Sequence, residues 1–200
     1  MSDRYPVCKG PNRDRGFPLD GTSATVRGQQ SAGDDRRGGV PDSSEAYAVL
    51  VFREEGRWQV SVLPEVLADD LEALIAAVAQ QPGESGSFAL VDVADEFFVA
   101  VRVQLGRVRL LLSDVTASVA WDLAAQVLEA LELDQPAEDE MDDVWPVGDL
   151  GIFADLGLDE MELGAILSDV DAYADEMLSA LARRLGFAEA YELAVDALVD

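Results

Sequence analysis

The chain has 200 residues, with 14 Lys and Arg against 40 Asp and Glu, and its net charge of −26 excludes a non-specific nucleic-acid binder, because such proteins need cations to displace the counterions of phosphates. Histidine is absent and Cys8 is the single cysteine, which excludes imidazole catalysis, an internal disulfide and a cysteine-based zinc site. No apolar stretch approaches the roughly 18 residues of a membrane span and no signal peptide is visible, so we expect a cytoplasmic protein.

The first 44 residues differ from the rest in composition. They hold 7 basic and 6 acidic residues, 7 of the 16 Gly and 4 of the 8 Pro, whereas residues 45–200 hold 7 basic and 34 acidic residues. Because their apolar residues follow no period and bury too little surface to offset chain entropy, we predict a disordered tail over 1–44. A basic nucleic-acid arm is one alternative, and a translation start further downstream is another.

Residues 45–133 are predicted to form an α+β domain, because hydrophobic alternation typical of strands is interrupted twice by helical spacing. Asp69, with Glu72 three residues later, is the expected capping box of the first helix. The predicted elements are strands Ala46–Arg53 and Arg57–Leu63, a helix over Leu67–Val78, strands Ser87–Val93, Glu96–Val103 and Arg107–Leu112, and a helix over Asp114–Leu131. The order ββαβββα favours an antiparallel sheet with both helices on one face.

Residues 134–147 break this pattern and are predicted to be an exposed acidic linker. Their run 138–143 lacks the alternating ligands and the glycine of a calcium loop, so no metal site is expected there. Residues 148–200 are predicted to form a small all-α region, with Asp159 and Asp171 as N-caps and Gly186 as a C-terminal stop. The expected helices cover Asp149–Leu156, Asp159–Leu167, Ala172–Leu185 and Ala188–Leu198.

The sequence contains few of the residues and motifs that are typical of catalysis. Neither GxxxxGK[ST] nor GxGxxG occurs, Lys9 is the only lysine, and no serine has a histidine partner. A pair of carboxylates acting as acid and base remains an enzymatic alternative, since only unequal environments would separate their pKa values. We therefore predict no catalytic residue, no cofactor and no metal ligand, and we do not expect an enzyme.

Three of the seven cations in residues 45–200 lie on one predicted hairpin: Arg102, Arg107 and Arg109. Alternation places them on the face opposite the hairpin's valines, and a two-residue turn at 105–106 would set Arg102 directly across from Arg109. They are either solubilising residues of an outer face or a docking point for a partner's carboxylate or phosphate. Trp145, beside Pro146 in the linker, is a further candidate for a surface contact, and these four residues are the partner-interface candidates.

Several short segments match sequences that are typical of one bacterial family. They are Ala46–Val49 with Gly56–Trp58, Glu96–Phe98, Leu111–Asp114, Pro146–Leu150 with Leu156-Gly157, and Ala180–Phe187. Over about residues 45–198 the chain thus resembles the tRNA adenosine deaminase-associated proteins. These segments are not catalytic motifs, so the resemblance indicates kinship and implies association with a tRNA adenosine deaminase.

The residues constrain what that association means. A zinc nucleobase deaminase needs a His or Cys ligand set and a catalytic glutamate, and this chain has no His and one Cys. The excess of acid in residues 45–200 disfavours direct binding of tRNA or any other nucleic acid. We predict a non-catalytic accessory protein of tRNA modification that binds the deaminase and no membrane, with its oligomeric state open. The alternative is an acidic nucleic-acid mimic or chaperone-like module for another basic protein.

Overall fold

The computed structural model describes residues 46–81, 83, 85–141, 144–169 and 171–199, so the expected tail 1–44 lies outside the described residues. Its centre is a six-stranded antiparallel sheet in the order β2-β1-β3-β4-β5-β6. The strands are β1 (Ala46–Glu54), β2 (Arg57–Val62), β3 (Ser87–Val93), β4 (Phe97–Gln104), β5 (Arg107–Leu112) and β6 (Val147–Gly148).

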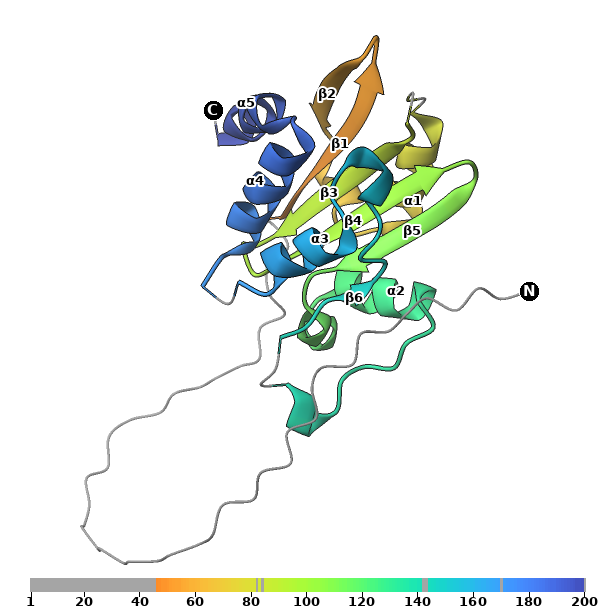
Figure 1. Cartoon of the computed structure of the whole chain (residues 1–200). Helices are drawn as coiled ribbons and strands as arrows, with labels where there is room; N and C mark the ends of the chain where they lie inside the picture. The colour runs from red at the N-terminus through yellow and green to blue at the C-terminus, as the bar shows by residue number, and fades with distance from the viewer. Residues whose placement is uncertain (1–45, 82, 84, 142–143, 170, 200) are drawn as a thin grey trace, which may run out of the picture.

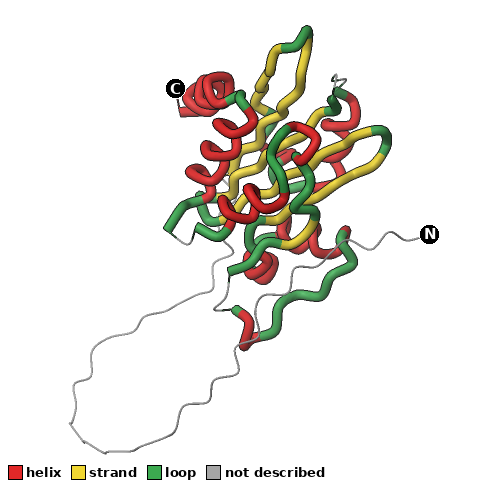
Figure 2. Tube along the Cα trace, in the orientation of Figure 1, coloured by secondary structure: helices red, strands yellow, loops and turns green. Residues whose placement is uncertain are grey.

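Helices cover both faces of the sheet, which makes a three-layer arrangement (Figure 1). Helices α1 (Leu71–Gln80) and α2 (Asp122–Ala130) lie on one face, and α3 (Glu160–Leu167), α4 (Ala174–Leu185) and α5 (Ala188–Val199) lie on the other. Figure 2 shows the strands as the middle layer between the two sets of helices. Since both faces are covered, every residue of β3 is buried.

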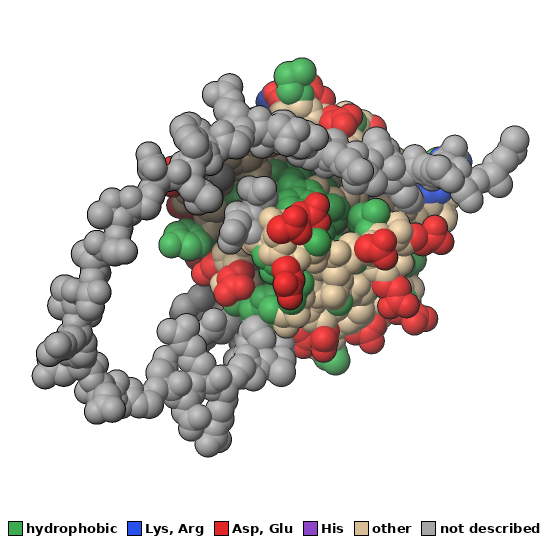
Figure 3. Space-filling model, turned by 90° about the horizontal axis from the view of Figure 1, so that it is seen from below, with side chains coloured by type: hydrophobic (Ala, Val, Ile, Leu, Met, Phe, Trp, Pro, Cys, Tyr) green, Lys and Arg blue, Asp and Glu red, His purple; other side chains and the backbone are tan. Residues whose placement is uncertain are grey.

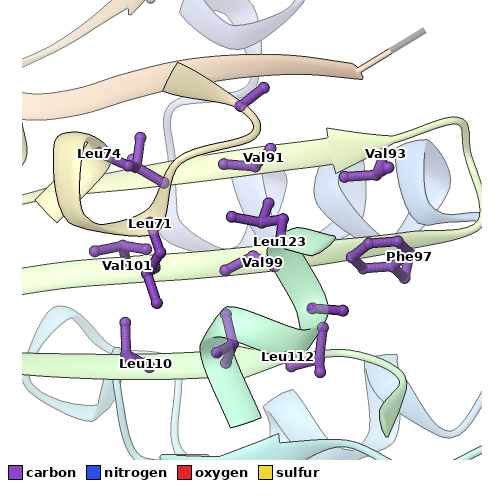
Figure 4. Close-up of a cluster of buried hydrophobic side chains, with 14 of the residues drawn as sticks. Leu71, Leu74, Val91, Val93, Phe97, Val99, Val101, Leu110, Leu112 and Leu123 are labelled. Atoms are coloured by element: carbon purple, nitrogen blue, oxygen red, sulfur yellow. The ribbon is translucent and has the colours of Figure 1, made fainter. Parts of the chain in front are cut away.

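The core under α1 and α2 is built by alternate residues of the strands. Leu71 and Leu74 of α1 and Leu123 of α2 pack on Val91, Val99 and other aliphatic side chains of the central strands (Figure 4). Burial of each such side chain contributes roughly 1.5–3 kcal/mol. The apolar side of each helix thus packs on the apolar face of the sheet, as expected from the helical period of one and the strand period of the other.

The second core lies under the C-terminal helices. Phe88 and Phe98 of the sheet contact Phe153, Leu178 and Leu181, all of them fully buried. Phe88 forms edge-on ring contacts with Phe153 and Phe187 at centroid distances of 5.0 and 5.8 Å. This core joins residues 148–199 to the same sheet that residues 46–112 build.

The predicted α+β class and the ββαβββα order with two helices on one face are confirmed. Asp159 caps α3 by accepting the Glu162 N–H at 2.9 Å, and Gly186 ends α4 with φ 85°. The division into 45–133, 134–147 and 148–200 stays a prediction. In the described part of 134–147, Glu138–Glu140 is an exposed 3₁₀ turn, but Val147 is buried and pairs with Leu112.

Four local predictions are wrong. Asp70 rather than Asp69 caps α1, accepting the Ala73 N–H at 2.9 Å. The helix expected over 114–131 is divided into a 3₁₀ turn, Val115–Val119, which Asp114 caps, and α2, because the backbone at Trp121 is extended. Residues 149–156 contain only the 3₁₀ turn Ala154–Leu156. Helix α4 begins after Tyr173, whose N–H is accepted by the Glu176 carboxylate, so Asp171 is not its cap.

Cleavage in the acidic segment tests how firmly the two halves are held. A Glu-specific protease should cut at the exposed Glu138 or Glu140 and leave Glu129 within α2 intact. Because the second core buries apolar side chains from both halves, we expect the two fragments to co-elute in native size-exclusion chromatography and to separate only in denaturant. Separation under native conditions would contradict this packing.

Candidate functional site

The hairpin of β4 and β5 carries the three arginines that the sequence singled out. Arg102 stands opposite Arg109 and Gln104 opposite Arg107, so the predicted two-residue turn at Leu105-Gly106 is confirmed. Both turn residues have positive φ, 51° for Leu105 and 75° for Gly106. Such turns favour Asn or Gly, and the left-handed region costs a residue such as Leu about 1–2 kcal/mol.

Arg102 lies in the interior, beneath the C-terminal layer, with 0% of its surface exposed. Its guanidinium forms a two-pronged ion pair with Asp155, with Nη1–Oδ1 2.5 Å and Nη2–Oδ2 2.8 Å. It also donates to the backbone carbonyls of Ile152 at 2.5 Å and Ser85 at 2.9 Å. The hydrogen bonds and the charge of Arg102 hold the pKa of the Asp155 carboxyl below its usual range. An outer-face position is therefore wrong for Arg102, because residues 149–156 cover that face.

The other polar side chains of the hairpin are held by the same segment. Arg109 Nε lies 2.5 Å from Asp149 Oδ2, and its Nη1 donates to the Ile152 carbonyl at 3.2 Å. Gln104 Nε2 donates to Asp155 Oδ2 at 3.1 Å. Arg102 and Arg109, like charges directly opposite each other, thus each have a carboxylate, which offsets their repulsion.

Arg107 and Trp145 lie elsewhere. Arg107 is exposed beside the turn and forms no ion pair with any described residue. Trp145 is half-buried against the first core, and its carbonyl accepts the Val115 N–H at 3.0 Å. The structure therefore brings Arg102 and Arg109 together with two aspartates and leaves Arg107 open to solvent. Whether any of the four contacts a partner stays a prediction.

A buried acidic site that sequence reasoning missed lies at the opposite end of the same face. Asp92 of β3 is 1% exposed, its Oδ1 accepts the Asp95 N–H at 3.0 Å, and its Oδ2 has no hydrogen-bond partner among the described residues. Burial, reinforced by the charges of Asp95 and Asp175, raises the pKa of Asp92 to about 7. The sequence signal that could have revealed this site is a carboxylate at an inward position of an otherwise apolar strand.

Two tyrosines complete this buried group. The hydroxyls of Tyr47, on β1 beside Asp92, and Tyr191, on α5, lie 2.8 Å apart. Burial raises the pKa of Tyr47 to about 12 and that of Tyr191 further still, so both stay protonated at any physiological pH. The hydroxyl pair therefore connects α5 to the sheet as a neutral contact.

The described residues also line a shallow pocket of about 480 Å³ between the β1–β2 turn and the junction of α4 and α5. Its walls include Arg53, Trp58 and Phe187. The Arg53 guanidinium lies over the Trp58 ring, 5.0 Å from its centroid, and the Trp58 and Phe187 rings are 5.6 Å apart. These side chains contact one another and form an aromatic wall of the pocket.

Comparison with known proteins identifies relatives of this chain. A family model described as "Rv3753c-like tRNA adenosine deaminase-associated protein" matches residues 46–188. Protein Rv3753c of Mycobacterium tuberculosis (strain ATCC 25618 / H37Rv) is 42% identical over 158 residues, which is 78% of this chain and 91% of that protein. The chain belongs to the Rv3753c-like tRNA adenosine deaminase-associated family. The resemblance stated from the sequence is confirmed.

The matched residues span the sheet and helices α1 to α4, and they end at the first residue of α5. They include both ends of the ion pairs from β4 and β5 to residues 149–155, so these contacts lie inside the family region. No solved structure matches this chain. Among the described residues, no helix is both long and apolar enough to cross a bilayer.

Replacing Arg102 tests the buried ion pair. In Arg102→Met the carbonyls of Ile152 and Ser85 lose their donor and Asp155 its partner, so we expect the free energy of unfolding to fall by about 2–4 kcal/mol. Arg107→Met, on the same hairpin but exposed, is the matched control and should change it by less than about 0.5 kcal/mol. Urea unfolding measures both, and equal stabilities would contradict the assignment.

Asp92 predicts a pH dependence. Because its pKa rises from 3.8 unfolded to about 7 folded, its protonated form is the one that folding favours, and stability falls as pH rises from about 4 through 7. Asp92→Asn should remove this dependence and gain up to about 4 kcal/mol at pH 8, with little gain at pH 4. Urea unfolding at the two pH values checks this, and an equal effect at both would refute it.

Proposed function

We propose that this protein is a non-catalytic, cytoplasmic accessory protein that binds a tRNA adenosine deaminase and acts on it by protein–protein contact. The family description, deaminase-associated, motivates the choice of partner. The sequence supports the absence of deaminase chemistry, since the chain has no His and one Cys, whereas a zinc nucleobase deaminase needs a His or Cys ligand set. Direct contact with tRNA forms no part of the proposal.

The observation that carries the proposal is an acidic surface layer that contains no cation. The layer of α1 and α2 with its flanking turns, residues 64–81 and 113–141, contains no Lys or Arg. It exposes Glu65, Asp69, Asp70, Glu72, Asp122, Glu129, Glu132, Asp134, Glu138, Asp139 and Glu140. Figure 3, seen from below the view of Figure 1, shows acidic side chains distributed around apolar ones, with basic side chains only near the edge of the view.

Such a surface suits a basic partner. An enzyme that holds tRNA needs cations to contact phosphates, and an acidic surface is attracted to these cations with fast association that salt slows. The arginines of the described residues do not neutralise this layer, because they lie on the strands or on α4. Three of them form ion pairs within the chain, with Asp155, Asp149 and Glu162. We expect the deaminase to dock on the α1–α2 layer.

Binding to the purified deaminase across a salt series is the first test. We expect complex formation near 0.05 M ionic strength and at least a tenfold weaker affinity near 0.5 M, because screening shortens the range of the charges. Isothermal titration with each protein separately pure measures it. No complex at low salt would refute the proposal, and tight binding to other basic proteins but not to the deaminase would favour the mimic or chaperone-like alternative.

A matched pair of variants locates the surface. Glu129→Gln, Glu132→Gln and Asp134→Asn together remove three exposed charges from the α1–α2 layer, and we expect roughly fivefold weaker binding from lost complementarity. Glu160→Gln, Glu192→Gln and Asp196→Asn remove three exposed charges from the C-terminal layer and serve as the control. Equal losses from both sets would mean that net charge, rather than this layer, attracts the partner.

A further inference from the structure

The β4–β5 tip, residues Gln104–Arg107, carries two unfavourable features on one residue. Leu105 is 99% exposed, so its side chain gains nothing from burial in this chain. Its φ of 51° lies in the left-handed region, which is rare for a bulky residue. Exposed apolar residues are common on proteins, but strained backbone at an exposed position is typical of functional sites.

The turn itself does not require leucine. The β1–β2 hairpin turns in the same way at Glu55-Gly56, with φ of 50° and 74°, and places a charged residue where the β4–β5 tip has Leu105. The β3–β4 turn likewise uses Ala94 and Asp95 with positive φ. Polar or small residues therefore fit this backbone in the same molecule, and the choice of leucine needs another reason.

The β4–β5 hairpin is fixed on both of its faces up to Gln104, the first residue of the tip. On one face of the hairpin, Gln104 and Arg102 bond to Asp155 and Arg109 bonds to Asp149, while on the other face Val103 and Val108 pack against the first core. An exposed side chain on a rigid support loses little entropy when it enters a partner. This arrangement is that of an anchor residue at a protein interface.

The chemistry beside Leu105 indicates what the anchor enters. Arg107 is exposed and forms no ion pair with any described residue, although the chain as a whole is strongly acidic. Its guanidinium is therefore free to pair with a carboxylate of a partner. A protein pocket with apolar walls and an acidic residue at its rim would match both side chains.

We infer that the β4–β5 tip is a second contact with the deaminase, in which Leu105 fills an apolar pocket whose rim carries a carboxylate for Arg107. This inference rests on the proposed function for the identity of the partner. The acidic layer then attracts the enzyme, and the tip, which carries the opposite charge, fixes how the two proteins are oriented.

Leu105→Asn separates this role from a structural one. Asn tolerates the left-handed backbone and removes the apolar side chain, so we expect the urea midpoint to stay or rise while affinity for the deaminase falls at least tenfold. Arg107→Gln should weaken binding about threefold. Leu193→Gln, which changes a 68% exposed leucine on α5, is the control and should bind as the unmodified chain does.

The outcomes separate the two proposals. If the unmodified chain binds the deaminase and Leu105→Asn binds within twofold of it, the inference is overturned and the proposed function stands. Loss of self-association alone on Leu105→Asn would overturn it as well, since the occupant would be a second copy of this chain.

If the unmodified chain does not bind the deaminase, the proposed function fails, and the inference, which names the same partner, fails with it. Photo-crosslinking in cells tests the contact at the tip directly. A benzophenone amino acid at position 105 should give an adduct with the deaminase, absent from position 193 and weakened by Arg107→Gln. The same adducts from both positions, or none, would overturn the inference.

Discussion

The buried ion pair between Arg102 and Asp155 is the contact on which the arrangement of the layers depends. A guanidinium with 0% exposure is tolerated only because a carboxylate and two carbonyls surround it. Asp155 and Ile152 come from the segment that leads to α3, and Ser85 comes from the segment that leads to β3. One side chain of the sheet therefore determines where both segments lie.

The strands were predictable because each is a short apolar or alternating run bounded by turn residues. Ser87–Val93 and Arg107–Leu112 needed no tertiary information, and the two amphipathic helices followed from their apolar stripes. What the sequence could not give was the cover over the second face. Arg102 and Arg109 at alternate positions indicate an outer face by composition, and only the distant Asp155 and Asp149 make it an inner one. Strand β6 was not predicted, because its two residues are too few to show the alternation of a strand.

The carboxylates outside the ion pairs include two kinds with different physical roles. Carboxylates at the surface of the α1–α2 layer remain solvated and give the protein its long-range field. Asp92 is the opposite case, because it is buried among Tyr47, Tyr191 and the charges of Asp95 and Asp175, and its ionisation costs stability. A carboxylate at the surface thus contributes to the long-range field, whereas a buried one opposes folding. Composition alone does not show which carboxylates are buried.

Arg102 and Arg109, opposite each other on β4 and β5, connect the sheet to residues 149–155. Without residues 149–155 these like charges would face each other with no carboxylate between them, and Phe88, Phe98 and Leu111 would lie on an open sheet face. Both costs disappear when the C-terminal segment packs, so the sheet and its second cover stabilise each other. The hairpin that carries Leu105 is rigid for the same reason, because the contacts that close the second core are also those that hold its base.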